Sequence, residues 1–415
     1  MRGHPMTAQR ILRQIVATTD VHSTLDNAVP FLTHLRALRP SSLVVDCGDF
    51  FEGSGYYRLA HGSIEREILL KLYDVLAPGN HGWPHHFEPE LHRLTVCANA
   101  VDADAGDALF RRLHTTRIAG RRIGITAVIG QQAFRTIPIA QRAEHRVTDP
   151  VQALREVMLA HHQEVDDWIL LSHSGFDEDV KLAAACPFLD VIFAGHCHSD
   201  QYGPVRVGDT LIVKGRELAD GYAVATPVGQ DWGAGTTRFP DRAPAFVPAE
   251  LAPLEAKIGA VRRQLTAVLG PVVKAYRHRT LDPHDLLVDL VARLHSGLGV
   301  DAVILNETAL RSVPLDDTLT LGDLLTVDPF DNQLIHAHVP EHFRHDLHGL
   351  TAHLTEQCGP LVTAPDPLPD GITSVLTTDY LADTYLAGRT HAAGLLLSQA
   401  VKHVLTAPPA NGDTP

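Results

Sequence analysis

Cysteine is scarce in this 415-residue chain, which has five cysteines and no C-x-x-C pair. An odd number without paired spacing does not make a disulfide framework. No apolar run approaches the roughly 18 residues that a membrane-spanning helix needs, so no membrane partner is expected. Residues 1–13 lack the apolar core of a secretory signal, which predicts a cytoplasmic protein.

Positive charge is also in short supply, with 35 Lys and Arg against 49 Asp and Glu and a formal net charge of -14. Binding to a phosphate backbone needs clustered Lys and Arg, so a nucleic-acid polymer is not expected as a partner. A small anionic substrate is compatible with this charge where metal ions supply local positive charge. The sequence does not indicate an oligomeric state.

Four short apolar runs each end at polar residues. They lead into Asp20-Val21-His22, Asp46-Cys47-Gly48-Asp49, Ser172-His173 and Gly195-His196-Cys197-His198. Continuous apolar runs suit strands covered on both faces, and functional groups in such sheets gather past the carboxyl ends of the strands. We therefore expect an α/β fold whose polar side chains converge on one rim. With 26 histidines in the chain, spacing alone does not establish a metal site.

The length of the chain predicts two domains. Helices are expected over 27–38 and 63–76, and again over 251–268, where apolar residues recur every three or four positions. Proline-rich residues before this last helix indicate a linker. The predicted division is a catalytic domain at 1–240, a linker with its helix at 241–270, a second domain at 271–406 and a disordered tail at 407–415.

One ordered set of motifs is more specific. It comprises Asp20-x-His22, Gly48-Asp49, Gly79-Asn80-His81, His173 and Gly195-His196-Cys197-His198. The set resembles the signature of the calcineurin-like metallophosphoesterases, in the 5'-nucleotidase branch that includes bifunctional UDP-sugar hydrolases. The resemblance implies a four-layer α/β/β/α sandwich, with a smaller C-terminal α/β substrate-binding domain joined by a linker helix.

The resemblance also implies two divalent metal ions, for which His, Asp and Asn ligands suit Zn, Mn, Fe or Co. One ion would be held by Asp20, His22, Asp49 and His198. Asp49 would bridge to a second ion held by Asn80, His173 and His196. Cys47 and Cys197 are not expected to be ligands.

Asn80 and His81 are the implied catalytic residues, and His81 would stabilise charge on the phosphoryl group or protonate the leaving oxygen. Typical 5'-nucleotidases place an acidic residue three positions after this histidine, where the present chain has Pro84. Three carboxylates could replace the missing partner through the fold: Glu88, Glu90 and Asp102.

The second domain resembles the substrate domain of the same enzymes. The implied substrate-binding residues are Arg277, Asn306, Arg311, Phe330 and Tyr385. Arginine suits phosphate or carboxylate, and an aromatic face suits a nucleobase. Glu307 and Thr308 replace the glycines that follow the family's asparagine, and the loop that supplies the second stacking ring is absent, so Tyr385 is the expected substitute.

These features predict a dinuclear-metal phosphomonoesterase that hydrolyses nucleoside 5'-monophosphates by attack of a metal-activated water. The altered base-binding loop favours one alternative, a phosphatase for a modified-nucleotide or sugar-phosphate intermediate of a biosynthetic pathway. Cleavage of nucleotide pyrophosphates or cyclic phosphodiesters would use the same site. A catalytically silent nucleotide-binding protein is the alternative from another class.

Overall fold

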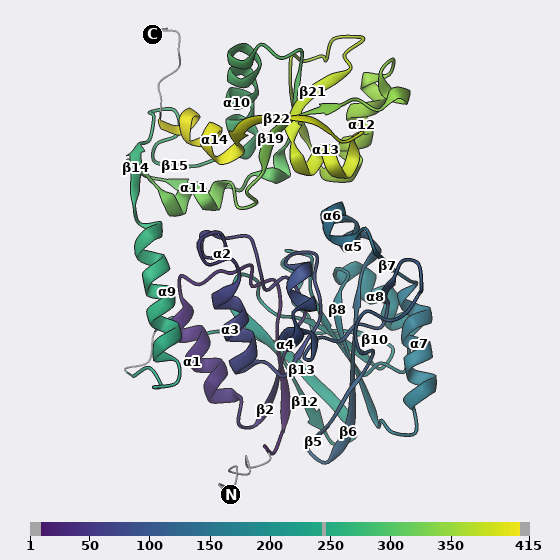
Figure 1. Ribbon diagram of the computed structural model, residues 1–415. Coiled ribbons are helices and arrows are strands. Elements are labelled where there is room, and N and C mark those ends of the chain that lie inside the picture. Colours follow the sequence, from purple (N-terminus) through teal and green to yellow (C-terminus); the bar gives the residue numbers. More distant parts are fainter. Residues whose placement is uncertain (1–9, 243–245, 407–415) are drawn as a thin grey trace, which may run out of the picture. The chain divides into compact units, whose positions relative to one another are not determined.

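The computed structural model describes residues 10–242 and 246–406. The tail at 407–415, for which the sequence predicts disorder, lies outside the described residues. The described chain separates into two compact units (Figure 1). The first comprises residues 10–52, 60–137, 141–242 and 246–259, and the second comprises 53–59, 138–140 and 260–406. The functional division at 240 and 270 stays a prediction.

The first unit contains two packed sheets. One has the order β13 (Asp231–Arg238), β12 (Gly221–Val228), β1 (Gln14–Thr18), β2 (Ser42–Asp46) and β3 (Val75–Leu76). The other has the order β10 (Val205–Val207), β11 (Thr210–Lys214), β9 (Val191–Ala194), β8 (Asp167–His173), β6 (Arg121–Ile129) and β5 (His114–Ile118). Apolar side chains of both sheets share one core, including Ile15, Val45, Ile125, Leu171 and Phe193. The two sheets therefore pack face to face.

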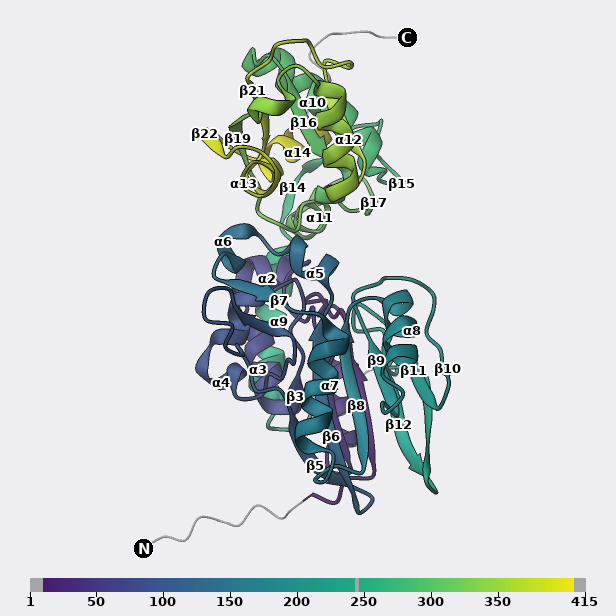
Figure 2. The same cartoon turned by 90° about the vertical axis from the view of Figure 1, so that its right-hand side faces the viewer.

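Helices cover the outer face of each sheet. Leu154 of α7 (Pro150–His161) and Leu182 of α8 (Phe176–Ala185) pack with Leu170 and Ile192 of the second sheet. Figure 2 shows α8 beside β9 and β11. On the first sheet, α1 (Ala28–Leu38) and α3 (Ser63–Leu72) lie on the opposite side (Figure 1). The predicted α/β/β/α sandwich is confirmed.

Parallel pairing directs the carboxyl ends of the central strands to one rim. β1 pairs with β2 and β2 with β3 in parallel, and in the second sheet β6, β8, β9 and β11 also pair in parallel. The segments that follow these strands carry the expected ligands. The rim predicted from the apolar runs is therefore present in the fold.

The second unit is a three-layer α/β/α structure. Its sheet has the order β20 (Leu361–Ala364), β16 (Val303–Asn306), β21 (Ser374–Thr378), β19 (Gln333–His338) and β22 (Arg389–Leu396). One face packs against α10 (Pro283–Leu298) and α14 (Leu397–Thr406), and the other against α12 (Leu347–Cys358) and α13 (Asp379–Tyr385). Each face buries its own apolar cluster.

Two helices end earlier than the sequence predicts. The helix expected over 63–76 ends at Leu72, because Tyr73 is extended (φ -102°, ψ 154°) and Val75–Leu76 pair as β3 with β2. The linker helix α9 (Ala252–Leu265) likewise stops before Val268, which begins β14 (Val268–Pro271) and pairs with β18 (Thr318–Thr320). In both cases the apolar residues fit a helical period but pair as strands instead, so the helix ends before them.

No helix within the described residues combines the length and the apolar character that crossing a membrane requires.

Candidate metal centre

The seven expected ligands follow five strands of the two sheets. Asp20 and His22 follow β1, Asp49 follows β2, Asn80 follows β3, His173 ends β8, and His196 and His198 follow β9. All but His196 and His198 are buried, and His198 is exposed. The structure therefore brings together, at one rim, side chains that are far apart in the sequence.

The backbone at four of these positions is unusual. Asp20, His22, Asp49 and His196 have φ values of 49°, 49°, 56° and 75°, in the left-handed region that non-glycine residues rarely adopt. Such conformations cost on the order of 1–3 kcal/mol each and persist only where the surrounding structure enforces them. Four such residues lie at one rim. We infer that the surrounding structure enforces this backbone strain because the site needs their side chains in these directions.

Two glycines let the strand-end loops come close together. A Cβ on Gly48 would lie 2.6 Å from Nδ1 of His173, and a Cβ on Gly79 would overlap the Asp49 carboxylate. Glycine is therefore required at both positions for the ligands to approach each other.

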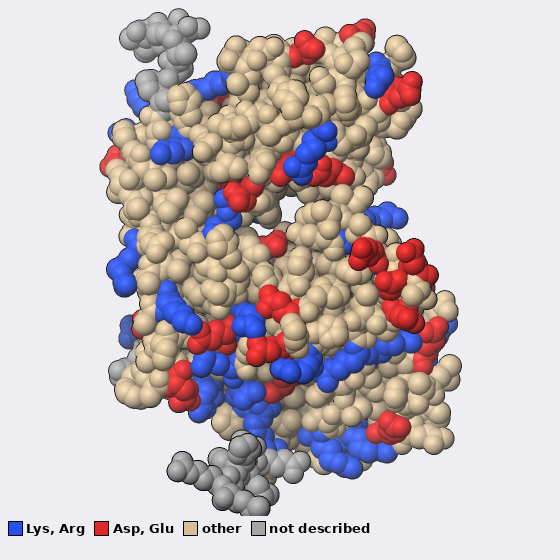
Figure 3. Space-filling model, in the orientation of Figure 1, with Lys and Arg blue, Asp and Glu red and all other residues tan. Residues whose placement is uncertain are grey.

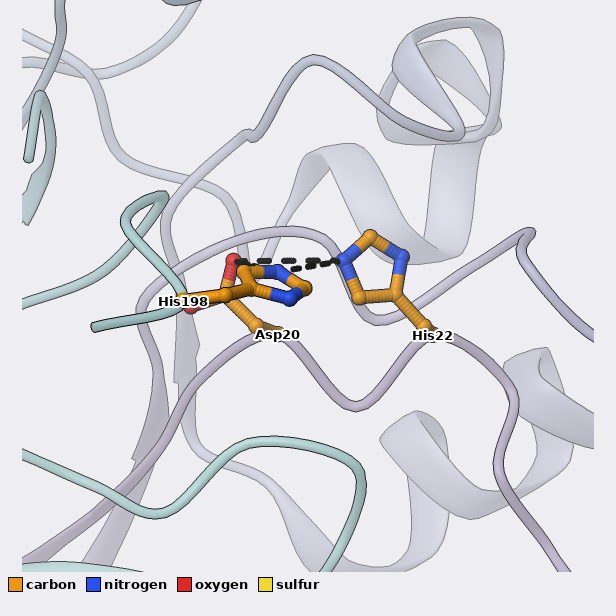
Figure 4. A group of neighbouring side chains, drawn as sticks. All are labelled: Asp20, His22 and His198. Carbon is orange, nitrogen blue, oxygen red and sulfur yellow. Dashed lines mark hydrogen bonds and ion pairs between the residues drawn. The ribbon is translucent and has the colours of Figure 1, made fainter. Parts of the chain in front are cut away.

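One group of side chains consists of Asp20, His22 and His198 (Figure 4). Nε2 of His22 lies 3.2 Å from Nε2 of His198, and Oδ1 of Asp20 lies 3.6 Å from Nε2 of His198 and 4.0 Å from Nε2 of His22. Figure 4 shows both imidazole rings directed toward the carboxylate. Two imidazole nitrogens and a carboxylate oxygen at these separations fit a small divalent cation.

A second group consists of Asp49, His173 and His196. Nε2 of His173 lies 3.3 Å from Oδ2 of Asp49 and 3.1 Å from Oδ1 of Asn80. Oδ2 of Asp49 also lies 3.8 Å from Nε2 of His22, so this carboxylate faces both groups. The donor set fits two cations that share Asp49.

A backbone carbonyl fixes the orientation of the His173 ring. Its Nδ1 lies 2.8 Å from the backbone oxygen of Cys47, which only accepts hydrogen bonds, so Nδ1 donates and Nε2 faces the cluster. A ligating histidine fixed in this way by a carbonyl is a common feature of metal sites. The Cys47 side chain itself is buried in the core between the sheets, in agreement with its exclusion as a ligand.

The charges of the site depend on each other. Burial alone would raise the pKa of Asp49, but the nearby His173 and His81 hold that pKa well below its usual value. Burial would lower the pKa of His173, yet the charge of Asp49 and their hydrogen bond raise it to about 9. Burial lowers the pKa of His22 to about 3, despite the Asp49 carboxylate. The site therefore holds ionised carboxylates and, at His22, a neutral imidazole ready to bind a cation.

Two residues that contact the His196–His198 segment were not found from the sequence. The amide oxygen of Gln132, in α5 (Gln131–Thr136), lies 2.6 Å from Nε2 of His196. The fully buried Lys214 donates through Nζ to the backbone oxygens of Cys197 (2.7 Å) and Ser199 (2.5 Å), and it pairs with Glu217. Lys214 thus holds the segment that carries His196 and His198, and the only sequence signal was a lysine ending an otherwise apolar strand.

The carboxylates expected to replace the missing partner of His81 do not do so. Glu88 pairs with His85 and Arg66, and Glu90 pairs with Arg66. Asp102 accepts hydrogen bonds from the backbone of its own turn. Instead, Oε2 of Glu52 lies 3.1 Å from Nδ1 of His81. The prediction was wrong because it looked downstream of the histidine, whereas Glu52 lies in the loop of Asp49.

In the second unit, Arg311 and Phe330 are in contact. The Arg311 guanidinium lies over the Phe330 ring, 4.9 Å from its centroid, and donates to the Thr308 backbone oxygen at 2.7 Å. Buried Asn306 donates to the hydroxyl of Thr308 at 2.6 Å. An arginine, an aromatic ring and an amide therefore lie near one loop, and their substrate-binding role stays a prediction.

The two other expected substrate residues lie elsewhere in that unit. Arg277 donates to the Val272 backbone oxygen at 3.1 and 2.8 Å. Tyr385 packs with the cluster under α12 and α13, and its hydroxyl lies 3.2 Å from that of Tyr380. Leu310, next to Arg311, belongs to the cluster on the opposite face of the sheet. A role for Tyr385 as a second stacking ring stays a prediction.

Comparisons with known proteins agree with this geometry. Residues 13–200 match the calcineurin-like phosphoesterase family. An apyrase of Aedes aegypti is 29% identical over 177 residues, which is 39% of this chain and 31% of the apyrase. The chain thus matches about a third of the length of this curated relative.

Solved structures match over nearly the whole chain. A 5'-nucleotidase precursor from Thermus thermophilus aligns with a TM-score of 0.71 at 18% identity, covering 95% of this chain and 96% of that one. A sulfate thiohydrolase from the same species, SoxB, aligns with a TM-score of 0.70 at 15% identity, covering 97% and 96%. At these identities the likeness shows the fold. The chain carries a calcineurin-like phosphoesterase domain at residues 13–200, and its fold is that of 5'-nucleotidase structures.

Proposed function

We propose that this protein is a dinuclear-metal phosphomonoesterase that hydrolyses nucleoside 5'-monophosphates. The observation that carries the proposal is the shared carboxylate: Oδ2 of Asp49 faces both His22 of one group and His173 of the other. A carboxylate between two groups of N and O donors is the arrangement that two neighbouring cations require.

Asp20, His22, Asp49 and His198 would hold one cation, and Asp49, Asn80, His173 and His196 the other. When bound, two divalent cations polarise the phosphoryl oxygens of an ester and lower the pKa of a water. His81 supplies an imidazole beside this centre, with its ring centroid 5.0 Å from that of His22. His81 is therefore placed to act on the phosphoryl group or on the oxygen that leaves it.

A nucleotide is the favoured substrate class for two reasons. The similar structures include a 5'-nucleotidase precursor, and the similar sequences include an apyrase. The second unit pairs a guanidinium with an aromatic ring at Arg311 and Phe330, a combination that suits an anionic, base-containing ligand. In Figure 3, Lys and Arg gather over the lower part of the first unit with some Asp and Glu among them. The formal net charge of the chain is nevertheless -14, which does not favour a nucleic-acid polymer as the substrate.

A dedicated phosphate ester of a biosynthetic pathway is the second candidate, and one observation favours it. Glu307 stands where the family has a glycine, and its carboxylate lies 2.6 Å from Nδ1 of His284. Thr308 occupies the next glycine position and bonds to Asn306 and to the Cys358 backbone oxygen. Side chains therefore fill a loop that glycines would leave open, which reshapes any pocket beside it.

Phosphate release from a panel of esters separates the two candidates. The purified protein, loaded with Mn or Zn, is assayed with nucleoside 5'-monophosphates, sugar phosphates, nucleotide sugars and cyclic nucleotides. Turnover highest on nucleoside 5'-monophosphates supports the proposal. Weak turnover of every nucleotide, with faster release from a sugar phosphate, contradicts it and favours the second candidate.

A further inference from the structure

The loop after β2 contacts His81 through two side chains. Its backbone N–H donates to Oδ1 of Asp49 at 2.8 Å, and its ring Nδ1 lies 3.1 Å from Oε2 of Glu52. Both side chains of the second contact are partly buried, with 22% of His81 and 23% of Glu52 exposed. The loop after β2 thus fixes the position of the histidine through Asp49 and the rotation of its ring through Glu52.

The loop adopts a strained backbone at the residue that makes this contact. Glu52 has a φ of 63°, and the following Gly53 has a φ of 94°. A left-handed glutamate is uncommon and is retained where the surroundings enforce it. Glu52 shares this conformation with Asp20, His22, Asp49 and His196, which are four of the residues in the metal-ligand groups. The strained backbone at Glu52 therefore lies at the same rim as the metal-ligand groups.

The contact with Glu52 determines which tautomer the His81 ring adopts. The Glu52 carboxylate accepts a hydrogen bond from Nδ1–H of His81, so a proton exchanged with a substrate would leave from Nε2. A carboxylate behind an imidazole also holds the ring in one tautomer and stabilises the positive charge that the doubly protonated ring carries.

We propose that Glu52 is the positioning residue that lets His81 act as a general acid in this chain. The proposal rests on the phosphomonoester hydrolysis proposed above. Water forms the new P–O bond and releases a proton, while the ester P–O bond breaks and its electron pair goes to the leaving oxygen. That oxygen takes the Nε2 proton of His81, and the ring, held by Glu52, regains a proton from solvent.

Leaving-group dependence tests this role. Protonation matters for an alkoxide leaving group, such as the ribose oxygen of a nucleoside 5'-monophosphate, and matters little for p-nitrophenolate. Glu52→Gln should lower kcat on the nucleotide by roughly 10- to 100-fold, as removal of the partner behind a functional histidine usually does. On p-nitrophenyl phosphate the same variant should stay close to wild type, and Glu52→Asp should recover part of the loss on the nucleotide.

Three controls distinguish positioning from structural damage. Glu88→Gln removes a nearby carboxylate that pairs with His85 and Arg66, and it should leave both substrates unaffected. Metal content, measured by mass spectrometry, should be the same in Glu52→Gln and wild type. In the His81→Ala background, Glu52→Gln should cause no further loss, because a residue that acts through His81 has no effect once His81 is absent.

Equal losses on both substrates, no loss on either, or a further loss in the His81→Ala background would each overturn the role of Glu52. Those results leave the proposed function standing, because wild-type turnover is measured in the same experiment. A wild-type protein that releases phosphate from neither ester would overturn the proposed function, and the role of Glu52 with it.

Discussion

Nε2 of His173 lies 3.3 Å from Oδ2 of Asp49, and both side chains are buried between the two sheets' carboxyl ends. In the metal-free protein this pair carries opposite charges, since the pKa of His173 is raised to about 9 and that of Asp49 is held well below its usual value. The His173 proton therefore stands where a cation would bind.

Metal uptake should consequently release about one proton at neutral pH, because ligands must lose their protons to bind a metal. His173 is protonated below about pH 9 and loses its proton above that value. Metal affinity should therefore rise as the pH increases from 6.5 to 9. Calorimetry in two buffers of different ionisation enthalpy measures the proton release, and an affinity that is flat over this range would contradict the account.

Removing the Asp49 carboxylate should abolish metal binding at both candidate cation sites. Asp49→Asn should reduce bound metal from two equivalents to fewer than one. It should also lower phosphate release by more than roughly 10- to 100-fold, which is the usual effect of removing a residue that only hydrogen-bonds to a metal ligand. Asp46→Asn is the matched control, because burial raises the pKa of Asp46 to about 8 and the side chain is largely neutral at pH 7. If Asp46→Asn were as damaging as Asp49→Asn, the particular role of Asp49 would be refuted.

Lys214 should support the metal site without touching a metal. Lys214→Met removes the donors to the backbone oxygens of Cys197 and Ser199, so the segment carrying His196 and His198 loosens. We expect metal affinity to fall by roughly 10- to 100-fold. Lys181→Met, at an exposed position of α8, is the control and should leave metal affinity unchanged. Combining Lys214→Met with Glu217→Gln also removes the partly buried carboxylate that loses its ion-pair partner in the single variant. Full recovery of affinity in the double variant would contradict a positioning role.

Phe330 should contribute to nucleotide recognition through its ring. Stacking of a base on an aromatic side chain contributes about 1–3 kcal/mol, so Phe330→Ala should lower kcat/KM for a nucleoside 5'-monophosphate by roughly 5- to 150-fold. Ribose 5-phosphate, which has no base, should be unaffected. Phe343→Ala, at another half-buried aromatic of the same unit, is the control. Equal effects of Phe330→Ala on both substrates would show that the Phe330 ring does not stack on the base.

The sequence predicts the rim well for a physical reason. Short apolar runs precede Asp20, Asp49, His173 and His196, and parallel strands bring their carboxyl ends to the same side, so these four residues could be placed together from the sequence. Asn80 could not, because β3 before it lies in residues for which the sequence predicts a helix, and only the family resemblance pointed to it. Glu52, Gln132 and Lys214 could not be found in this way. Their contacts depend on loop conformation and on packing between segments that are distant in the chain, which local patterns do not encode.

The ends of the helices show the same limit. Residues 73–76 and Val268 fit a helical period, but pairing of β3 with β2 and of β14 with β18 decides their conformation. In the second unit, the sequence identified an arginine and an aromatic residue, and the contact of Arg311 with Phe330 became visible only in the structure. Tertiary contacts therefore decide both kinds of detail.

A paired measurement on the purified protein and its Asp49→Asn variant tests most directly whether Asp49 joins two cation sites that hydrolyse phosphate esters. Bound metal is counted by mass spectrometry, and phosphate release from nucleoside 5'-monophosphates is recorded on the same samples. We expect two equivalents of metal and rapid release from the wild type, loss of both in the variant, and loss of the wild-type activity on chelation. Nucleotide binding without metal, together with no phosphate release from any ester, would contradict it and indicate a silent binding protein.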